Sequence, residues 1–219
     1  MQRLVQEFFN LEVMAKVAPF LLHGLLQTLL LCSFLIPIGL FGGLVVMGLT
    51  TSPRWWVRWP AMVAVDFFRA FPPLVLLVFV YAGLPFIGLH VPALAAVAVA
   101  FLINSSSYYG EIYRAGIKSV PEGQREAARS TGLTPAQALV YVTLPQAVRN
   151  VLPDLLSNTV ELVKLTTLAS VISVPELLHS ANLARSLTFN SSPLVLASII
   201  YLILLLPVVR LIARLEHKL

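Results

Sequence analysis

The sequence predicts an all-α integral membrane protein that crosses the bilayer five times. Of its 219 residues, 58% are hydrophobic and 11% are charged, whereas about a quarter of the residues in a soluble domain carry a charge. The mean hydropathy is +0.86, and several long stretches lack Asp, Glu, Lys and Arg. This composition excludes a soluble enzyme, a disordered regulator and a nucleic-acid-binding domain, because the chain has too few polar side chains to cover a water-exposed surface.

The N-terminal segment 1–16 predicts a short helix that lies at the membrane surface, because its apolar residues recur at helical spacing among polar ones. The next charge-free stretch, 17–53, accommodates one long pass, since about 20 apolar residues span the hydrocarbon core. The remaining residues, 17–219, form a single transmembrane domain. Its expected passes cover about 17–49, 61–82, 91–113, 152–174 and 193–213.

The second and third passes are separated by turn residues. The uncharged stretch 70–110 is too long for a single crossing, and Gly83-Leu84-Pro85 and Gly88-Leu89-His90-Val91-Pro92 interrupt it. The fourth pass differs from the others because it carries Asp154, Glu161 and Lys164.

Basic residues are concentrated on one predicted side of the membrane. Ten of the 15 lie on that side and three on the opposite side, and the more basic side is cytoplasmic in most membrane proteins. We therefore expect the N-terminus outside and the C-terminus inside. The ten are Arg54, Arg58, Arg114, Lys118, Arg125, Arg129, Arg149, Arg210, Arg214 and Lys218, and the three are Arg3, Lys16 and Arg185.

The largest cytoplasmic loop, 114–149, predicts two short helices broken at Gly132. The stretch 122–128 is rich in helix-favouring residues, and Thr134 followed by Pro135 is typical of a helix start. Such a hairpin fits the groove of a partner protein. The pattern alone equally allows an amphipathic hairpin that lies on the lipid headgroups.

The loop also carries a specific motif. Its residues match the pattern E-A-A-x3-G-x9-I-x-L-P, with Val142 in place of Ile, and this resembles the EAA loop of ABC-importer permeases. The resemblance implies a type I ABC importer permease, in which the loop between passes three and four is the coupling helix that docks into a cytoplasmic ATPase. The implied coupling residues are Glu126, Ala127, Ala128, Gly132, Leu144 and Pro145.

Other segments resemble the polar amino-acid uptake branch of that family, the histidine, glutamine and arginine permease type. The resemblance implies a permease subunit in the bacterial cytoplasmic (inner) membrane that carries a polar amino acid or close derivative. The implied partners are a cytoplasmic ABC ATPase dimer, a second permease subunit, identical or homologous, and an external solute-binding protein. The resembling segments are Gly24 with Thr28, Phe68-Arg69-Ala70-Phe71-Pro72, Ser107–Ile117 and Lys164–Leu168, with departures from the branch pattern at Ala70, Phe71 and Thr167.

Charged residues inside the passes are candidates for the cargo pathway, because charges at bilayer depth are costly unless they are paired or face a wet cavity. Glu161 and Lys164 lie on one helix face, and with the hydroxyls after them they could bind the ammonium and carboxylate of an amino acid. The pairs Asp66–Arg69 and Glu111–Arg114 repeat the spacing, and all three could instead be structural pairs. The candidate pathway residues are Glu161, Lys164, Thr166, Thr167, Asn104, Tyr108, Asp66 and Arg69, although small polar residues near Asn104 are also typical of helix packing.

No catalytic or cofactor site is predicted. The four histidines fall in separate segments without metal-ligand spacing, and Cys32 is the only cysteine. The chain lacks the phosphate-binding pattern G-x4-G-K-S/T, so ATP and Mg are expected on the partner ATPase. A secondary transporter would show internal repeats and a membrane enzyme would show clustered catalytic residues. The sequence contains neither feature.

Overall fold

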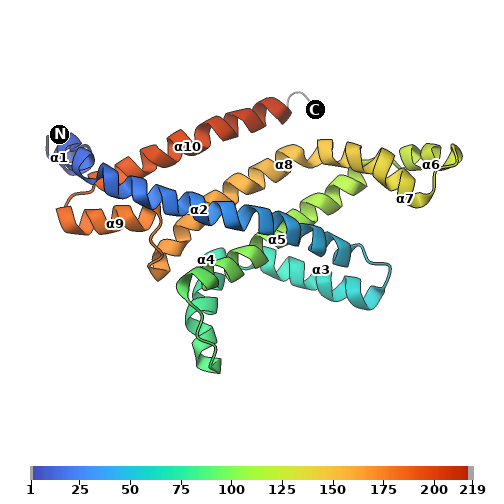
Figure 1. The fold of residues 1–219 in the computed structure, drawn as a ribbon, viewed down its shortest axis with the longest axis horizontal. Helices are drawn as coiled ribbons and strands as arrows, with labels where there is room; N and C mark the ends of the chain where they lie inside the picture. Colours follow the sequence, from blue (N-terminus) through green and yellow to red (C-terminus); the bar gives the residue numbers. More distant parts are fainter. Residues whose placement is uncertain (1, 217–219) are drawn as a thin grey trace. The chain divides into compact units, whose positions relative to one another are not determined.

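A computed structural model describes residues 2–216 as helices joined by short connections, without a strand in that range (Figure 1). Met1 and residues 217–219, which include His217 and Lys218 of the predicted basic tail, lie outside the described residues. The helices are α1 (Gln2–Phe8), α2 (Leu11–Thr50), α3 (Trp55–Ala70), α4 (Pro73–Val78), η1 (Phe79–Gly83), η2 (Leu84–Ile87), α5 (Ala93–Ser119), α6 (Glu122–Ser130), α7 (Pro135–Ala138), η3 (Leu139–Thr143), α8 (Leu144–Leu165), η4 (Thr166–Ile172), α9 (Leu177–Thr188) and α10 (Ser192–Glu216).

The chain folds into two compact units. The first holds the chain up to Pro37 together with Pro72–Phe101 and Val160–Arg210, and the second holds Ile38–Phe71, Leu102–Thr159 and the chain after Arg210. The helices α2, α5, α8 and α10 run across these boundaries and contribute residues to both units.

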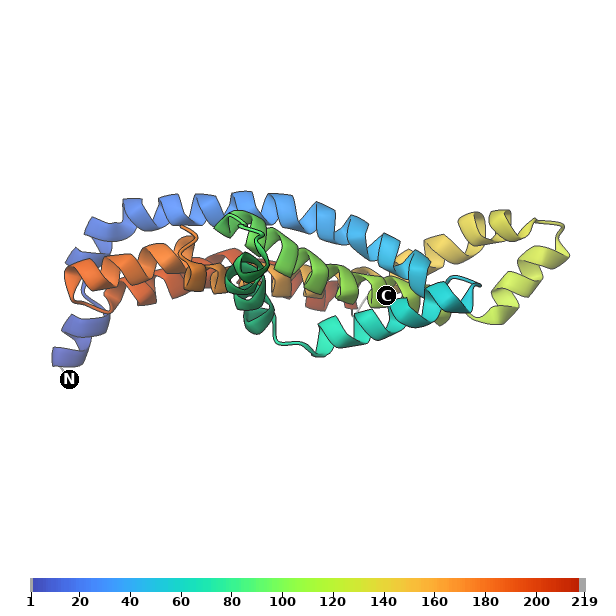
Figure 2. The ribbon, with the colours of Figure 1, turned by 90° about the horizontal axis from the view of Figure 1, so that it is seen from below.

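In the first unit, α9 packs beside the first half of α2, and both views of the ribbon show the two helices side by side (Figures 1 and 2). Their shared core is built from Val17 and Leu21 of α2, three residues of α9 and Ala197 of α10. The alanines on α9 and α10 allow the helix backbones to approach closely, as small residues do between membrane helices. The α9 residues of this core are Leu177, Ala181 and Ala184.

In the second unit, glycines bring α2 close to α5. A Cβ on Gly43 would lie 2.4 Å from the Cβ of Tyr109, and a Cβ on Gly110 would lie 2.4 Å from a methyl group of Val46. Beyond these helices, α6 and α7 form a hairpin between the end of α5 and the start of η3 and α8 (Figure 2).

Four helical stretches of the described residues are long and apolar enough to cross a membrane, and a fifth segment qualifies if an interrupted pair is counted as one span. The stretches are Arg3–Thr50, Ala93–Ser119, Pro135–Ile172 and Ser192–Leu215, and the interrupted pair is Trp55–Ala70 with Pro73–Ile87. The protein is thus all-α, with four to five membrane spans, in agreement with the predicted fold class.

The second span is not the continuous helix expected over 61–82. The helix α3 starts earlier, at Trp55, and ends at Ala70, and Phe71 is extended with φ −79° and ψ 128°. Pro72 and Pro73 explain the break, because a proline has no N–H to donate and disfavours helical geometry in the residue before it.

The expected surface helix over 1–16 is also divided. The helix α1 ends at Phe8, and residues from Leu11 onward already belong to α2. Asn10 causes the new start, because its Oδ1 accepts hydrogen bonds from the backbone N–H groups of Glu12 and Val13, as an N-cap residue does. The fourth predicted pass begins earlier than expected, since α8 starts at Leu144 and continues into η4.

Candidate translocation and coupling sites

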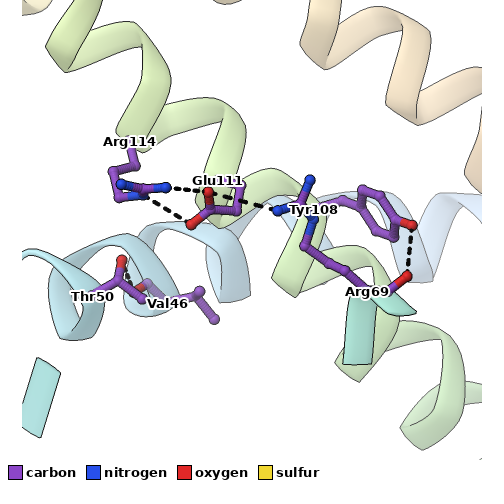
Figure 3. A network of polar contacts seen from close by, with 6 residues as sticks. All are labelled: Val46, Thr50, Arg69, Tyr108, Glu111 and Arg114. Carbon is purple, nitrogen blue, oxygen red and sulfur yellow. Dashed lines mark hydrogen bonds and ion pairs between the residues drawn. The ribbon is translucent and has the colours of Figure 1, made fainter. Parts of the chain in front are cut away.

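A network of polar contacts joins α3 to α5 in the second unit (Figure 3). Glu111 is its centre: Oε1 accepts from Nε of Arg114 at 2.9 Å, Oε2 accepts from Nη2 of Arg114 at 2.5 Å, and Arg69 Nη1 lies 3.7 Å from Oε2. The Arg69 guanidinium also lies over the Tyr108 ring, 5.2 Å from its centroid. The Tyr108 hydroxyl donates to the backbone carbonyl of Arg69 at 3.1 Å, so both helices are held at the point where α3 ends.

Of the structural pairs that the sequence left open, Glu111–Arg114 forms, whereas Asp66–Arg69 does not. Asp66 is exposed and forms no ion pair with any described residue. Arg69 reaches Glu111 instead, because it lies in the last turn of α3, where Tyr108 and Glu111 of α5 are close. Spacing along one helix could not reveal this contact between two helices.

Asn104 lies in the packed contact between the same helices. Its side chain is buried, and Nδ2 donates to the backbone carbonyl of Phe68 at 3.3 Å. The neighbouring Ser105 hydroxyl is buried without a hydrogen-bond partner among the described residues. The structure therefore brings Asn104, Tyr108 and Arg69 together at the end of α3. Asn104 is buried there in the contact between α3 and α5.

Glu161 and Lys164 form an ion pair on α8, in the first unit. Both side chains are exposed, at 63% for Glu161 and 51% for Lys164. Of the two threonines that follow, Thr166 is buried and Thr167 is partly exposed. Each hydroxyl donates at 2.7 Å to the backbone carbonyl three residues earlier, Thr166 to Val163 and Thr167 to Lys164. The charged pair is the most exposed part of this group.

The α6–α7 hairpin turns at Gly132 as expected. Gly132 is left-handed with φ +91°, its N–H donates to the Arg129 carbonyl at 3.0 Å, and the N–H of Leu133 donates to the Ala128 carbonyl at 3.4 Å, which is the Schellman motif that ends many helices. Thr134 then starts α7 through a capping box with Gln137.

The motif residues of this hairpin are mostly presented to the outside of the chain. Glu126, Ala127, Leu144 and Pro145 are exposed, whereas Ala128 is buried against the rest of the hairpin. The hairpin is therefore folded without a partner protein. Ala128 of the motif packs inside it, and the exposed motif residues form part of its surface.

Sequence reasoning missed one buried acidic residue, Glu176, in the first unit. Its carboxylate accepts from the backbone N–H groups of Leu178 at 2.8 Å and His179 at 2.6 Å, and from the Tyr201 hydroxyl at 3.1 Å. It is fully buried and caps the start of α9. Local sequence gave no clear signal, because glutamate is not among the residues that are preferred at a helix N-cap.

The described residues contain no cluster of three or more His, Cys, Asp or Glu side chains that could hold a metal ion. The fold and the candidate sites together define a multi-pass membrane permease of the kind found in ABC transporters. The defining features are the apolar spans, a charged pair exposed on one of them, and a helical hairpin that carries the E-A-A motif.

Comparison with known proteins places the chain in a family. It belongs to the binding-protein-dependent transport system inner membrane components, whose family model matches residues 35–219. It is 36% identical over 194 residues, which are 88% of this chain and 86% of the relative, to the probable amino-acid ABC transporter permease protein YckA of Bacillus subtilis (strain 168). It is 36% identical over 173 residues, 79% of each chain, to the probable glutamine ABC transporter permease protein GlnP of the same organism.

Among solved structures, the chain resembles one described as the crystal structure of an amino acid ABC transporter with histidines. The TM-score is 0.88 at 36% sequence identity, with 94% of this chain and 97% of that chain covered. The fold is that of a type I ABC importer permease, and the family is that of amino-acid ABC transporter permeases, as the sequence predicted.

Proposed function

We propose that this chain is the permease subunit of an ATP-driven importer for a polar amino acid or a close derivative. The relatives named for amino-acid and glutamine transport support this substrate class. We further propose that it lies in a bacterial cytoplasmic membrane with its N-terminus outside, because the distribution of basic residues follows the positive-inside rule.

The observation that carries the proposal is the preformed α6–α7 hairpin. Its turn is closed by backbone hydrogen bonds at Gly132, and it exposes Glu126 and Ala127. A rigid helical knob of this kind fits a groove of a second protein. We assign that groove to one subunit of a cytoplasmic ATPase dimer, which would bind ATP and Mg and move the permease through Glu126, Ala127, Ala128, Gly132, Leu144 and Pro145.

The exposed Glu161–Lys164 pair supports a second permease subunit. An exposed charge at bilayer depth is costly unless it faces water or a partner, and this pair is half-exposed or more on a membrane-spanning stretch. We infer that it faces a pathway formed with an identical or homologous permease, in which Glu161 accepts from an amino acid's ammonium group and Lys164 donates to its carboxylate. In the first unit, Thr166 and Thr167 are further proposed pathway residues, and in the second unit we separately propose Asn104, Tyr108, Asp66 and Arg69 as pathway residues. An external solute-binding protein is proposed to deliver the cargo.

The coupling role is tested by the ATPase activity of the complete transporter in liposomes, with the external binding protein and a panel of amino acids. Glu126→Lys is expected to lower substrate-stimulated hydrolysis at least about tenfold or to release the ATPase, since a charge reversal at a docking contact commonly costs over 1.4 kcal/mol. Glu12→Lys, at an exposed position outside the hairpin, is the matched control and should leave hydrolysis unchanged. If no ATPase co-purifies and Glu126→Lys is silent, the proposed function is wrong.

The pathway role is tested by uptake with Glu161→Gln, which keeps the size of the side chain and removes its charge. Transport of at least one amino acid should weaken or the order of preference should change, while assembly of the complex is retained. Asp154→Asn, at an exposed acidic position of the same helix, is the control. Unaltered uptake across the whole panel would contradict this assignment.

A further inference from the structure

A basic groove lies in the second unit where α2 ends, α3 begins and α5 ends. Its volume is about 590 Å³. Three cationic side chains, two indole rings and threonine hydroxyls line it, and no carboxylate does. The residues that matter here are Thr50, Trp55, Arg58, Trp59, Arg114 and Lys118.

Two of the three cations are uncompensated. Arg114 is held by Glu111 (Figure 3). Arg58 and Lys118 form no ion pair with any other residue in the described part of the chain, and both are exposed. The groove therefore presents two free positive charges beside Trp55 and Trp59, which are exposed at 67% and 65%. Tryptophan is enriched at the level of lipid headgroups, where its ring is apolar and its N–H can donate a hydrogen bond.

An apolar groove of about 450 Å³ follows along the same three helices. It is lined by Phe41, Val45 and Leu49 of α2 and by Ala64 of α3, among other mainly apolar residues. The linings of the two grooves adjoin in sequence on α2 and α3, because Leu49 precedes Thr50 of the basic groove and Ala61 precedes Met62. Both grooves lie wholly within the second unit.

We propose that the paired grooves bind one anionic phospholipid of the leaflet next to the coupling hairpin, the cytoplasmic leaflet in the orientation proposed above. The phosphate lies between Arg58 and Lys118, the glycerol region lies against Trp55 and Trp59, and one acyl chain lies in the apolar groove along α2 and α3. Charge complementarity selects an anionic headgroup, as basic pockets between helices on the cytoplasmic side do. The apolar groove selects a lipid over a free phosphate ion.

Native mass spectrometry of the detergent-purified transporter tests this site, with dioleoyl-phosphatidylglycerol and dioleoyl-phosphatidylcholine as the two probes. Phosphatidylglycerol should bind at least about tenfold more tightly than phosphatidylcholine. Removing both charges with Arg58→Gln and Lys118→Gln should weaken phosphatidylglycerol binding about 25-fold, or about fivefold for each charge. Arg149→Gln with Arg214→Gln removes two exposed charges outside the groove and is the matched control.

Three further arms separate a lipid site from its alternatives. The charge-retaining pair Arg58→Lys and Lys118→Arg should keep most of the binding, which distinguishes lost charge from misfolding. Ala64→Phe, which fills the apolar groove, should lower phosphatidylglycerol binding at least about threefold, because the groove then has less apolar surface to bury. Inorganic phosphate should not displace the lipid.

The proposal is overturned by any of four outcomes: equal binding of the two lipids, an equal loss in the Arg149 and Arg214 control, no effect of Ala64→Phe, or displacement of the lipid by inorganic phosphate. None of these outcomes bears on the coupling experiment, so the lipid site and the importer function fail independently.

Discussion

Arg69 at the end of α3 lies 3.7 Å from the carboxylate of Glu111 on α5, and the same carboxylate receives two hydrogen bonds from Arg114. One acidic group thus balances two guanidinium groups at a contact between two helices. Glu111 is the least exposed of the three, with 17% of its side chain accessible, so it is the residue whose loss the contact can least tolerate.

We expect Glu111→Gln to destabilise the chain by about 2 kcal/mol, the scale of hydrogen bonds to charged groups, because two cations lose their counter-charge. Arg69→Gln should cost less than about 1 kcal/mol, since its side chain is 38% exposed and its pair is longer. Thermal unfolding of the purified chain in detergent measures both. Asp66→Asn is the control and should be neutral, and a loss there as large as that of Glu111→Gln would contradict the assigned network.

The hairpin turn makes a second prediction, on backbone geometry. A Cβ at Gly132 or at Gly123 would meet no other atom within 4 Å, but only Gly132 has a positive φ, at +91°. Gly132→Ala should therefore cost about 1–2 kcal/mol in the turn and lower the substrate-stimulated ATPase activity. Gly123→Ala lies within α6 and should stabilise the hairpin slightly, since alanine favours helix. Equal behaviour of the two variants in the ATPase assay would show that the shape of the turn does not matter.

The close approach of α2 and α9 makes a third prediction. A Cβ on Gly24 would lie 2.4 Å from the Ser180 hydroxyl oxygen and 3.1 Å from the Glu176 carbonyl. Gly24→Ala should cost about 1–3 kcal/mol, the usual penalty of overpacking, whereas Gly48→Ala on the same helix meets nothing within 4 Å and should be tolerated. Thermal unfolding is again the measurement. Ser180→Gly added to Gly24→Ala should recover part of the loss, and the absence of any recovery would argue against this contact.

The buried carboxylate of Glu176 makes a fourth prediction. Glu176→Gln should destabilise the chain by about 2 kcal/mol or more, because one of the two acceptor oxygens becomes an NH₂ group that faces N–H and O–H donors. Tyr201→Phe removes a single hydrogen bond and should cost about 1 kcal/mol. Tyr81→Phe is a control outside this contact. A larger loss in Tyr201→Phe than in Glu176→Gln would show that the carboxylate is not the centre of the network.

Features that depend on nearby residues were predictable from the chain. The helix start at Thr134 and the turn at Gly132 formed as expected, and Glu111–Arg114 and Glu161–Lys164 form the ion pairs that the sequence had left open as alternatives. Each involves residues within a few positions of one another, so local spacing brings the partners within reach. The break after Ala70 is equally local, since Phe71 is followed by two prolines, but hydropathy does not reveal it.

Contacts between distant segments were not predictable in this way. Arg69 could pair with Asp66 on its own helix or with Glu111 on another, and the choice depends on where Tyr108 lies against the end of α3. Glu176 is similar, since its partner Tyr201 is 25 residues away. The adjoining basic and apolar grooves also need three helices to be brought together.

The sequence by itself determined that the protein is a helical membrane protein with a short hairpin that turns at Gly132, and through its E-A-A motif it indicated the permease family. These properties follow from hydropathy, from charge distribution and from a motif within one loop. All three are properties of the linear sequence. Only the tertiary structure decided which charges are paired, which glycines are contact points and where the grooves lie. The physical reason is that these depend on side chains separated by tens of residues, whose distances are set by the packing of one helix against another.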